Sequence, residues 1–199
     1  MFTGINHLAF ITRDMDKTIR FYRDLLGLPL VAGVGNSQFK HYFFKVSEQD
    51  QLAFFAYDQA APMVYKFHGV PTDKPLGFDH VSLGVDTKAN LFAMLDRLEA
   101  AGFKVTGPVD HGFGWSIYFF DPNNIPLEIT WQNLEIVKPP VLADGTPTEA
   151  AREGSDPVPG HWPEVSKPTP ADEWHAYPGA GFEIRPRALD EKRGRAAGE

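Results

Sequence analysis

The hydrophobic pattern of this chain occurs twice. The strand-like stretch 4–10 (GINHLAF) returns as 77–83 (GFDHVSL), and each copy holds one histidine among apolar residues. Apolar residues at helical spacing follow both copies: Met15, Ile19, Tyr22 and Leu26 after the first, and Leu91, Leu95 and Leu98 after the second. The pattern therefore predicts a strand and then a helix in each half.

Capping residues bound both predicted helices. Asp14 is placed to cap the first helix and Asp86 or Thr87 the second, while Gly27 and Gly102 follow their ends. Strand-like runs separated by turn residues come next in each half: 28–34, 39–46 and 51–57, then 103–107, 114–120 and 125–131. Each half is thus predicted to be a βαβββ module, which is too small to bury both faces of its sheet alone.

We therefore expect an α+β fold in which two βαβββ modules, 1–60 and 77–133, pack as a cupped mixed sheet within one domain, 1–133. A linker over 61–76 joins them. Residues 134–199 hold ten of the 17 prolines of the chain and few regular apolar periods. They are predicted to form a Pro-rich extended C-terminal arm.

Aromatic residues in this arm favour a docking role. Trp162, Trp174 and Tyr177 lie in the proline-rich segment, and a fully solvated linker rarely carries such side chains. We expect the arm to dock on the body or on a second subunit. A disordered tail is the alternative.

The composition excludes several classes of function. The chain of 199 residues is 43% hydrophobic and can bury a core, whereas its net charge of −7 argues against a nucleic-acid partner. It has no cysteine, which excludes disulfides and thiolate chemistry. No apolar run is long enough to cross a bilayer, and the N-terminus does not resemble a leader peptide. We expect a soluble cytoplasmic homo-oligomer with no nucleic-acid or membrane partner.

Three ionisable residues, His7, His80 and Glu128, lie in separate strand-like runs. Two histidines and one carboxylate are the ligands of a non-haem Fe(II) facial triad, which leaves positions open for substrate and oxygen. A single strand histidine is more often a hydrogen-bonded core residue. The equivalent positions of His7 and His80 in two repeats favour a shared role, and a buried Glu is costly unless it is paired or bound to metal. The sequence predicts a metal site, with Fe(II) as the metal and Mn(II) or Zn(II) as alternatives.

Alignment of the two repeats indicates the number of ligands. Leu127-Glu128-Ile129 matches Leu52-Ala53-Phe54, and because alanine cannot bind a metal the site keeps three protein ligands. Tyr118 lies ten residues before Glu128, with a turn at the midpoint. In a symmetric hairpin the two face each other, with Cβ atoms about 5 Å apart. Tyr118 is a candidate to bond a metal-bound oxygen or position a proton, and packing inside the sheet is the alternative.

The sequence around each remaining histidine gives a weaker indication of a functional role. His111 lies in a glycine-rich loop, 107–114 (GPVDHGFG), and could close over a substrate, although an exposed loop histidine without a task is an equal alternative. His41 is a weak candidate to support the metal site. The others are predicted to be surface residues: His68, His161 and His175.

These features resemble the vicinal oxygen chelate superfamily, which includes glyoxalases, bleomycin-resistance proteins and type I extradiol dioxygenases. The resemblance covers about 1–133. Its opening, Asn6-His7-Leu8 followed by 20–28 (RFYRDLLGL), does not separate the members. The segment 107–122 (GPVDHGFGWSIYFFDP) is more specific and resembles catechol 2,3-dioxygenases of the one-domain form. The small residue Ala53 also fits that group better than glyoxalases, which carry a ligand there.

The resemblance implies that His7, His80 and Glu128 bind Fe(II) and that Tyr118 and His111 contact the substrate. The implied function is an extradiol-type dioxygenase, an oxidoreductase that cleaves a catechol-like aromatic substrate with O₂. Aromatic residues of the cup could hold the ring: Phe39, Phe43, Trp115 and Trp131.

One position departs from the dioxygenase pattern. Asp50 stands where the group usually places an acid–base histidine, so Asp50 is the candidate to take over proton transfer, with His41 or a different reaction as alternatives.

Two other functions remain open. A metal-dependent glyoxalase-like or fosfomycin-transferase-like enzyme shares the triad. However, Lys138 is the first basic residue after Glu128, and Ala9 stands where the transferases use a hydroxyl. A non-catalytic drug-binding resistance protein would not need the triad.

Overall fold

The computed structural model describes residues 4–35, 40–73, 79–135 and 148–177. The chain divides into a body, which contains residues 1–133, and a separate unit, 134–178. The end of the predicted linker, Phe39 and much of the predicted arm lie outside the described residues.

The first module has the predicted βαβββ order. Strand β1 (His7–Thr12) leads into helix α1 (Met15–Ile19), which continues as a π-helical segment (Arg20–Leu25) and ends at Gly27. Strands β2 (Leu30–Gly35), β3 (Lys40–Lys45) and β4 (Gln51–Ala56) complete the sheet in the spatial order β1-β4-β3-β2. Asp14 caps α1 as predicted, because its side chain accepts from the backbone N–H of Lys17 at 2.9 Å.

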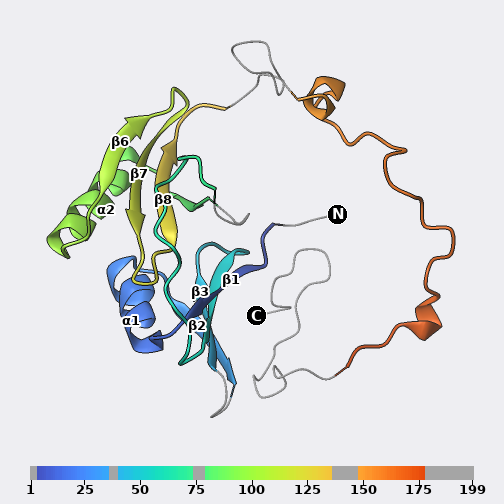
Figure 1. Cartoon of the computed structure of the whole chain (residues 1–199), viewed down its shortest axis with the longest axis horizontal. Coiled ribbons are helices and arrows are strands. Elements are labelled where there is room, and N and C mark those ends of the chain that lie inside the picture. Colours follow the sequence, from blue (N-terminus) through green and yellow to red (C-terminus); the bar gives the residue numbers. More distant parts are fainter. Residues whose placement is uncertain (1–3, 36–39, 74–78, 136–147, 178–199) are drawn as a thin grey trace, which may run out of the picture. The chain divides into compact units, whose positions relative to one another are not determined.

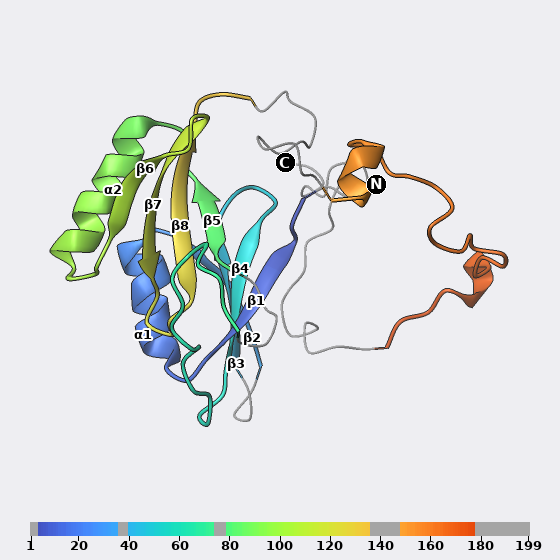
Figure 2. The ribbon, with the colours of Figure 1, turned by 45° about the horizontal axis from the view of Figure 1, so that its top comes forward.

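The second module repeats this plan. Strand β5 (Val81–Gly84) and helix α2 (Lys88–Ala100) precede β6 (Thr106–Asp110), β7 (Gly114–Phe120) and β8 (Pro126–Gln132), in the order β5-β8-β7-β6. Figures 1 and 2 show α2 lying along this sheet. The predicted strand 103–107 begins later, because the N–H of Phe103 still bonds the α2 carbonyl of Leu98 at 3.0 Å. The expected single cupped sheet is two four-stranded mixed sheets, one in each module.

An aromatic core joins the two modules. Tyr22 packs against Phe44 and Phe54 of the first sheet, with ring centroids 5.5 and 4.8 Å away. The neighbouring Phe21 packs against Phe103 and Phe119 of the second module, at 5.0 and 6.4 Å. The segment after α1 is therefore the hydrophobic contact between the two sheets, and both views place it beside the β7–β8 hairpin.

Buried hydrogen bonds fix the same junction. The hydroxyl of Tyr22 donates to Asp121 Oδ2 at 3.1 Å, and Thr12 Oγ1 donates to Asn123 Oδ1 at 2.9 Å. Asp121 is 4% exposed, and burial, which outweighs its hydrogen bonds, raises the pKa of its carboxyl. Its Oδ1 accepts the backbone N–H groups of Asn123 and Ile125, at 2.7 and 2.8 Å. One carboxyl therefore shapes the β7–β8 turn and anchors it to the first module.

The proline-rich unit has little regular structure where it is described. Residues 148–177 contain two 3₁₀ turns, Ala150–Glu153 and Ala171–Glu173, and no strand. Docking of the arm stays a prediction. None of the helices in the described part of the chain is both long and apolar enough to cross a membrane.

Replacement of Asp121 by alanine should lower the free energy of unfolding by about 3 kcal/mol. The change leaves the hydroxyl of Tyr22 and two backbone N–H groups without their acceptor, and each buried unpaired group costs about 1–3 kcal/mol. Urea unfolding of the wild type and of Asp121→Ala measures the difference. An exposed helix change, Asp96→Ala, is the control.

The same carboxyl predicts a pH dependence. Because the folded pKa of Asp121 is raised, the stability that this group contributes is complete below the ordinary Asp pKa of about 3.9 and is lost as pH rises through the folded pKa. The stability of the wild type relative to Asp121→Asn should therefore fall across that interval. A difference that stays constant with pH would contradict the raised pKa.

Candidate functional site

The β7–β8 hairpin places Tyr118 directly opposite Glu128, as the symmetric hairpin predicted. Next to Glu128 on its other side is Ser82 of β5. Strand alternation turns Ser116, Tyr118, Glu128 and Thr130 to one face of the sheet, whereas the residues between them contribute to the core. This polar face, on β5, β8 and β7, carries the candidate site.

His80 reaches this face from the residue just before β5. Its Nε2 lies 3.0 Å from Glu128 Oε2, and its Nδ1 lies 2.6 Å from Asp79 Oδ1. Asp79 in turn binds the ammonium group of Lys66, which together with His80 and the Gly69 N–H holds the pKa of Asp79 below its usual range. Both ring nitrogens of His80 are therefore oriented by carboxylates.

Glu128 is 8% exposed and remains a carboxylate. Burial raises its pKa, but hydrogen bonds from Ser116, Tyr118 and Ser82 together outweigh burial and leave the pKa below its usual value. A chain of hydroxyls lies beside it, in which Thr130 Oγ1 is 2.8 Å from Ser82 Oγ and 2.9 Å from Ser116 Oγ. The site thus keeps a negative charge in a mostly buried position.

Tyr118 and His111 form a second pair beside the first. The hydroxyl of Tyr118 is 2.7 Å from His111 Nε2, and the Tyr118 and His80 rings are 6.0 Å apart. Burial, followed by Glu128, raises the pKa of Tyr118 to about 12, so its hydroxyl keeps its proton at neutral pH. His111 directly follows strand β6, in the turn between β6 and β7. Within β6, Gly107 has a φ of 114°, and a Cβ there would lie 2.7 Å from the Ser116 carbonyl.

His7 lies in different surroundings, on the first sheet. Its ring is 6.3 Å from His41 and 5.6 Å from Phe43, and its Nδ1 is 2.7 Å from Asn6 Oδ1. Within the described ranges, no group of three or more His, Asp or Glu side chains could hold a metal. The donors of His80 and Glu128 suit a divalent metal, but in one chain His7 does not complete a three-ligand group with them.

Asp50 binds the backbone N–H of Ile5 at 3.0 Å and the hydroxyl of Ser47 at 2.6 Å, so its carboxylate stabilises a turn. Trp115 and Trp131 do not line the polar face: they pack near α2, where Lys88 Nζ lies 3.3 Å from the Trp115 ring centre.

The register confirms the alignment of the repeats around Ala53. Ala53 pairs with Ala9 in the first module as Glu128 pairs with Ser82 in the second. The residue of the first module that is equivalent to Glu128 therefore has no side-chain atom that can bind a metal.

Sequence analysis missed two residues near this site. His68, predicted to lie on the surface, has its ring 5.4 Å from that of His80 and 4.9 Å from that of Tyr118. Lys66 binds the carboxylate next to His80. Both lie in the irregular linker, where hydrophobic periodicity carries no signal. In the sequence, only Asp79, the acidic residue directly before His80, indicated such a contact.

The family profile "Glyoxalase/Bleomycin resistance protein/Dioxygenase superfamily" matches residues 4–129. The chain belongs to this superfamily. Two relatives carry the same activity in their names. A "Probable lactoylglutathione lyase" of Vibrio parahaemolyticus is 29% identical over 130 residues, which cover 63% of this chain and 88% of the relative. A lactoylglutathione lyase of Haemophilus influenzae is 27% identical over 132 residues, which cover 62% and 89%.

These relatives overturn the predicted main function. They support a glyoxalase-like enzyme, so the prediction of an extradiol dioxygenase acting on catechol-like substrates was wrong. An oxidoreductase that uses O₂ as a co-substrate is likewise not supported by these relatives. The superfamily assignment itself is confirmed.

Solved structures of the superfamily share the fold. A glyoxylase/bleomycin resistance protein/dioxygenase domain from Frankia sp. EAN1pec has a TM-score of 0.57 at 21% identity and covers 67% of this chain and 100% of its own. The fosfomycin resistance protein FosX from Listeria monocytogenes has a TM-score of 0.51 at 20% identity, over 68% and 95%.

The pKa of Tyr118 tests the geometry of the site. Since Glu128 contributes to the raised value of about 12, Glu128→Gln should lower the pKa of Tyr118 toward the ordinary value of about 10, without reaching it because burial remains. Ultraviolet difference titration against Tyr118→Phe isolates this tyrosine. Glu99→Gln, on the exposed side of α2, should leave the titration unchanged. An ordinary pKa in the wild type would contradict this geometry.

Proposed function

We propose that this protein is a metal-dependent lyase or isomerase of the glyoxalase type. Its substrate is a small molecule that presents two oxygens on neighbouring carbon atoms, such as an α-hydroxyacyl thioester. The observation that carries the proposal is the pairing of His80 Nε2 with Glu128 Oε2 at 3.0 Å, next to Tyr118 and His111. The lactoylglutathione lyases among its relatives support the reaction class.

The residues of the polar face have distinct tasks in this proposal. His80 and Glu128 hold a divalent cation, which polarises a substrate carbonyl when bound. Tyr118 keeps its proton at neutral pH and donates a hydrogen bond to a substrate oxygen. His111, 2.7 Å from the phenol, orients that hydroxyl through their hydrogen bond. The metal is Zn(II), Mn(II) or Fe(II), and metal analysis decides among them.

His7 is the proposed third ligand, and we propose that a second copy of the chain supplies it. In one chain His7 lies with His41 on the first sheet, and no three-ligand group forms among the described residues. Strand β1 is an edge strand with exposed apolar side chains, including Ile11, which is 54% exposed. An exposed strand edge of this kind is a template for pairing with another chain. A homo-oligomer that covers β1 could bring His7 to the polar face of its neighbour.

The activity prediction concerns Glu128. Metal-loaded wild type should interconvert S-lactoylglutathione with glutathione and methylglyoxal, followed by the ultraviolet absorbance of the thioester. Glu128→Ala should lower metal affinity and activity by more than about 100-fold, since even an outer partner of a metal ligand is worth 10- to 100-fold. Glu99→Ala is the matched control, because its carboxylate is exposed on α2.

A second substrate separates the alternatives. If the same protein modifies fosfomycin but does not act on the thioester, the proposed reaction is wrong and the fosfomycin reaction takes its place. Wild type that binds no divalent metal would end the metal-dependent proposal.

Mixing two inactive variants tests the shared site. His7→Ala and Glu128→Ala should each be inactive alone. If His7 comes from the partner copy, a re-equilibrated mixture should regain about a quarter of the wild-type sites, because half of the dimers are mixed and one of their two sites is intact. A mixture with no activity would overturn the shared site.

A further inference from the structure

His80 lies one residue before strand β5, although the sequence repeat places it within a strand. The ladder between β5 and β8 begins with Val81 opposite Leu127, so β5 starts one residue after His80. By contrast, His7 pairs within its ladder, opposite Gln51. Strand pairing therefore does not fix the backbone of His80, and its orientation requires other contacts.

The linker provides these contacts through Asp79. Lys66 Nζ donates to Asp79 Oδ2, and the backbone N–H of Gly69 donates to Asp79 Oδ1 at 2.8 Å. The same Oδ1 lies 2.6 Å from His80 Nδ1. Two donors from the linker thus hold the carboxylate that accepts from His80. With Nδ1 committed to Asp79, the other nitrogen of His80 faces Glu128.

The linker also contacts the strand that carries Glu128. His68 Nε2 donates to the carbonyl oxygen of Leu127 at 2.9 Å, directly before Glu128. Its ring lies 5.0 Å from Phe120 as well. The residues 66–69 therefore bridge the two segments that carry His80 and Glu128.

We propose that residues 66–69 are a clamp that positions the metal ligands, with Lys66 orienting His80 through Asp79. The clamp rests on the proposed metal site. Lys66 and Asp79 are positioning residues, because neither touches the metal or the substrate. The competing explanation is that these contacts only attach the linker to the body.

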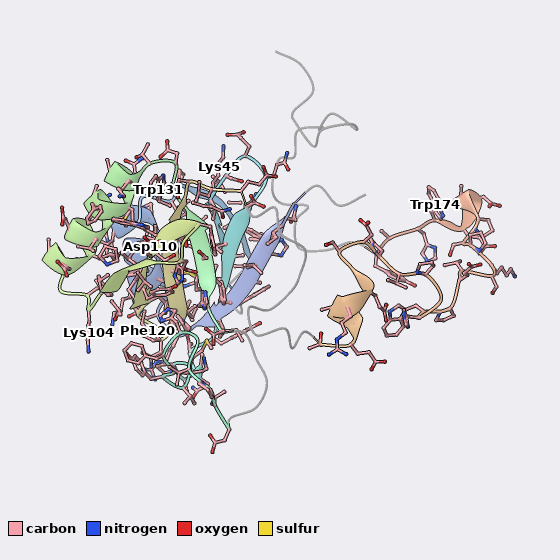
Figure 3. The ribbon with its side chains drawn as sticks, turned by 90° about the horizontal axis from the view of Figure 1, so that it is seen from above. Lys45, Lys104, Asp110, Phe120, Trp131 and Trp174 are labelled. Atoms are coloured by element: carbon pink, nitrogen blue, oxygen red, sulfur yellow. The ribbon has the colours of Figure 1, made fainter. Side chains whose placement is uncertain are left out.

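Two lysine ion pairs provide a matched comparison. Lys66 pairs with Asp79, and Lys45 pairs with Glu48 at 2.7 Å in a surface turn. Figure 3 shows Lys45 on the opposite side of the body from Phe120, which packs against His68. Lys66→Met and Lys45→Met each remove one ion pair, but only the first is connected to His80.

The experiment measures metal affinity and the hydrogen bond of His80. Zinc affinity is measured by competition with a chelator, and the Nδ1 proton of His80 is followed by ¹H–¹⁵N NMR in the metal-free protein. Lys66→Met should lower zinc affinity 10- to 100-fold and abolish the protected Nδ1 proton signal. Lys66→Arg should restore both, and Lys45→Met should change neither. In an Asp79→Asn background Lys66→Met should have no further effect, because both act through the same bond.

The outcomes separate the clamp from the proposed function. If Lys66→Met matches Lys45→Met in both measurements, or if its effect adds to that of Asp79→Asn, the clamp is overturned while the metal site stands. If the wild type binds no metal, the proposed function fails, and the NMR signal alone decides. Loss of the signal in Lys66→Met then supports the orienting role, and its persistence overturns it.

Discussion

The buried carboxyl of Asp121 is the constraint on which both the packing and the site depend. It binds the backbone of the β7–β8 turn through one oxygen and the hydroxyl of Tyr22 through the other. The first set of bonds fixes the hairpin, and a shift of one residue in a hairpin turns every side chain to the other face. The same carboxyl that joins the modules therefore determines that Tyr118 faces Glu128.

The two modules share one strand order, but the candidate site residues are distributed unequally between them. Both sheets have the same strand order and equivalent ladders, yet Ala53 stands where the second module has Glu128. The charged and hydroxyl groups around Glu128 have no counterpart there, and His41 instead stacks on Phe55 at 3.6 Å. The second module holds most of the candidate machinery, and the first contributes His7 and an aromatic surface.

Local patterns in the sequence predicted the modules well, because helix caps and turns act over a few residues. Asp14 and Thr87 cap the helices, and the midpoint turn set the register of Tyr118 and Glu128. Contacts that depend on irregular backbone could not be predicted, which is why Lys66 and His68 were missed. The reaction was misjudged for a different reason: the motif around His111 describes a hairpin and its loop, and such local geometry is compatible with more than one chemistry.

In the proposed shared site, Ala53 limits how protons can be handled, because it lies on the sheet that carries His7. A carboxylate at that position could have accepted a proton, but an alanine cannot, and Asp50 is engaged in its turn. The described groups beside His80 and Glu128 include the Tyr118–His111 pair and the imidazole of His68. Because Tyr118 remains protonated, it serves as a hydrogen-bond donor and not as a base at neutral pH. His111 lies in the exposed turn between β6 and β7, 2.7 Å from the phenol. In the proposed reaction, the hydrogen bond between His111 and Tyr118 therefore depends on the β6–β7 turn, whereas substrate binding depends on the polar face of the sheet.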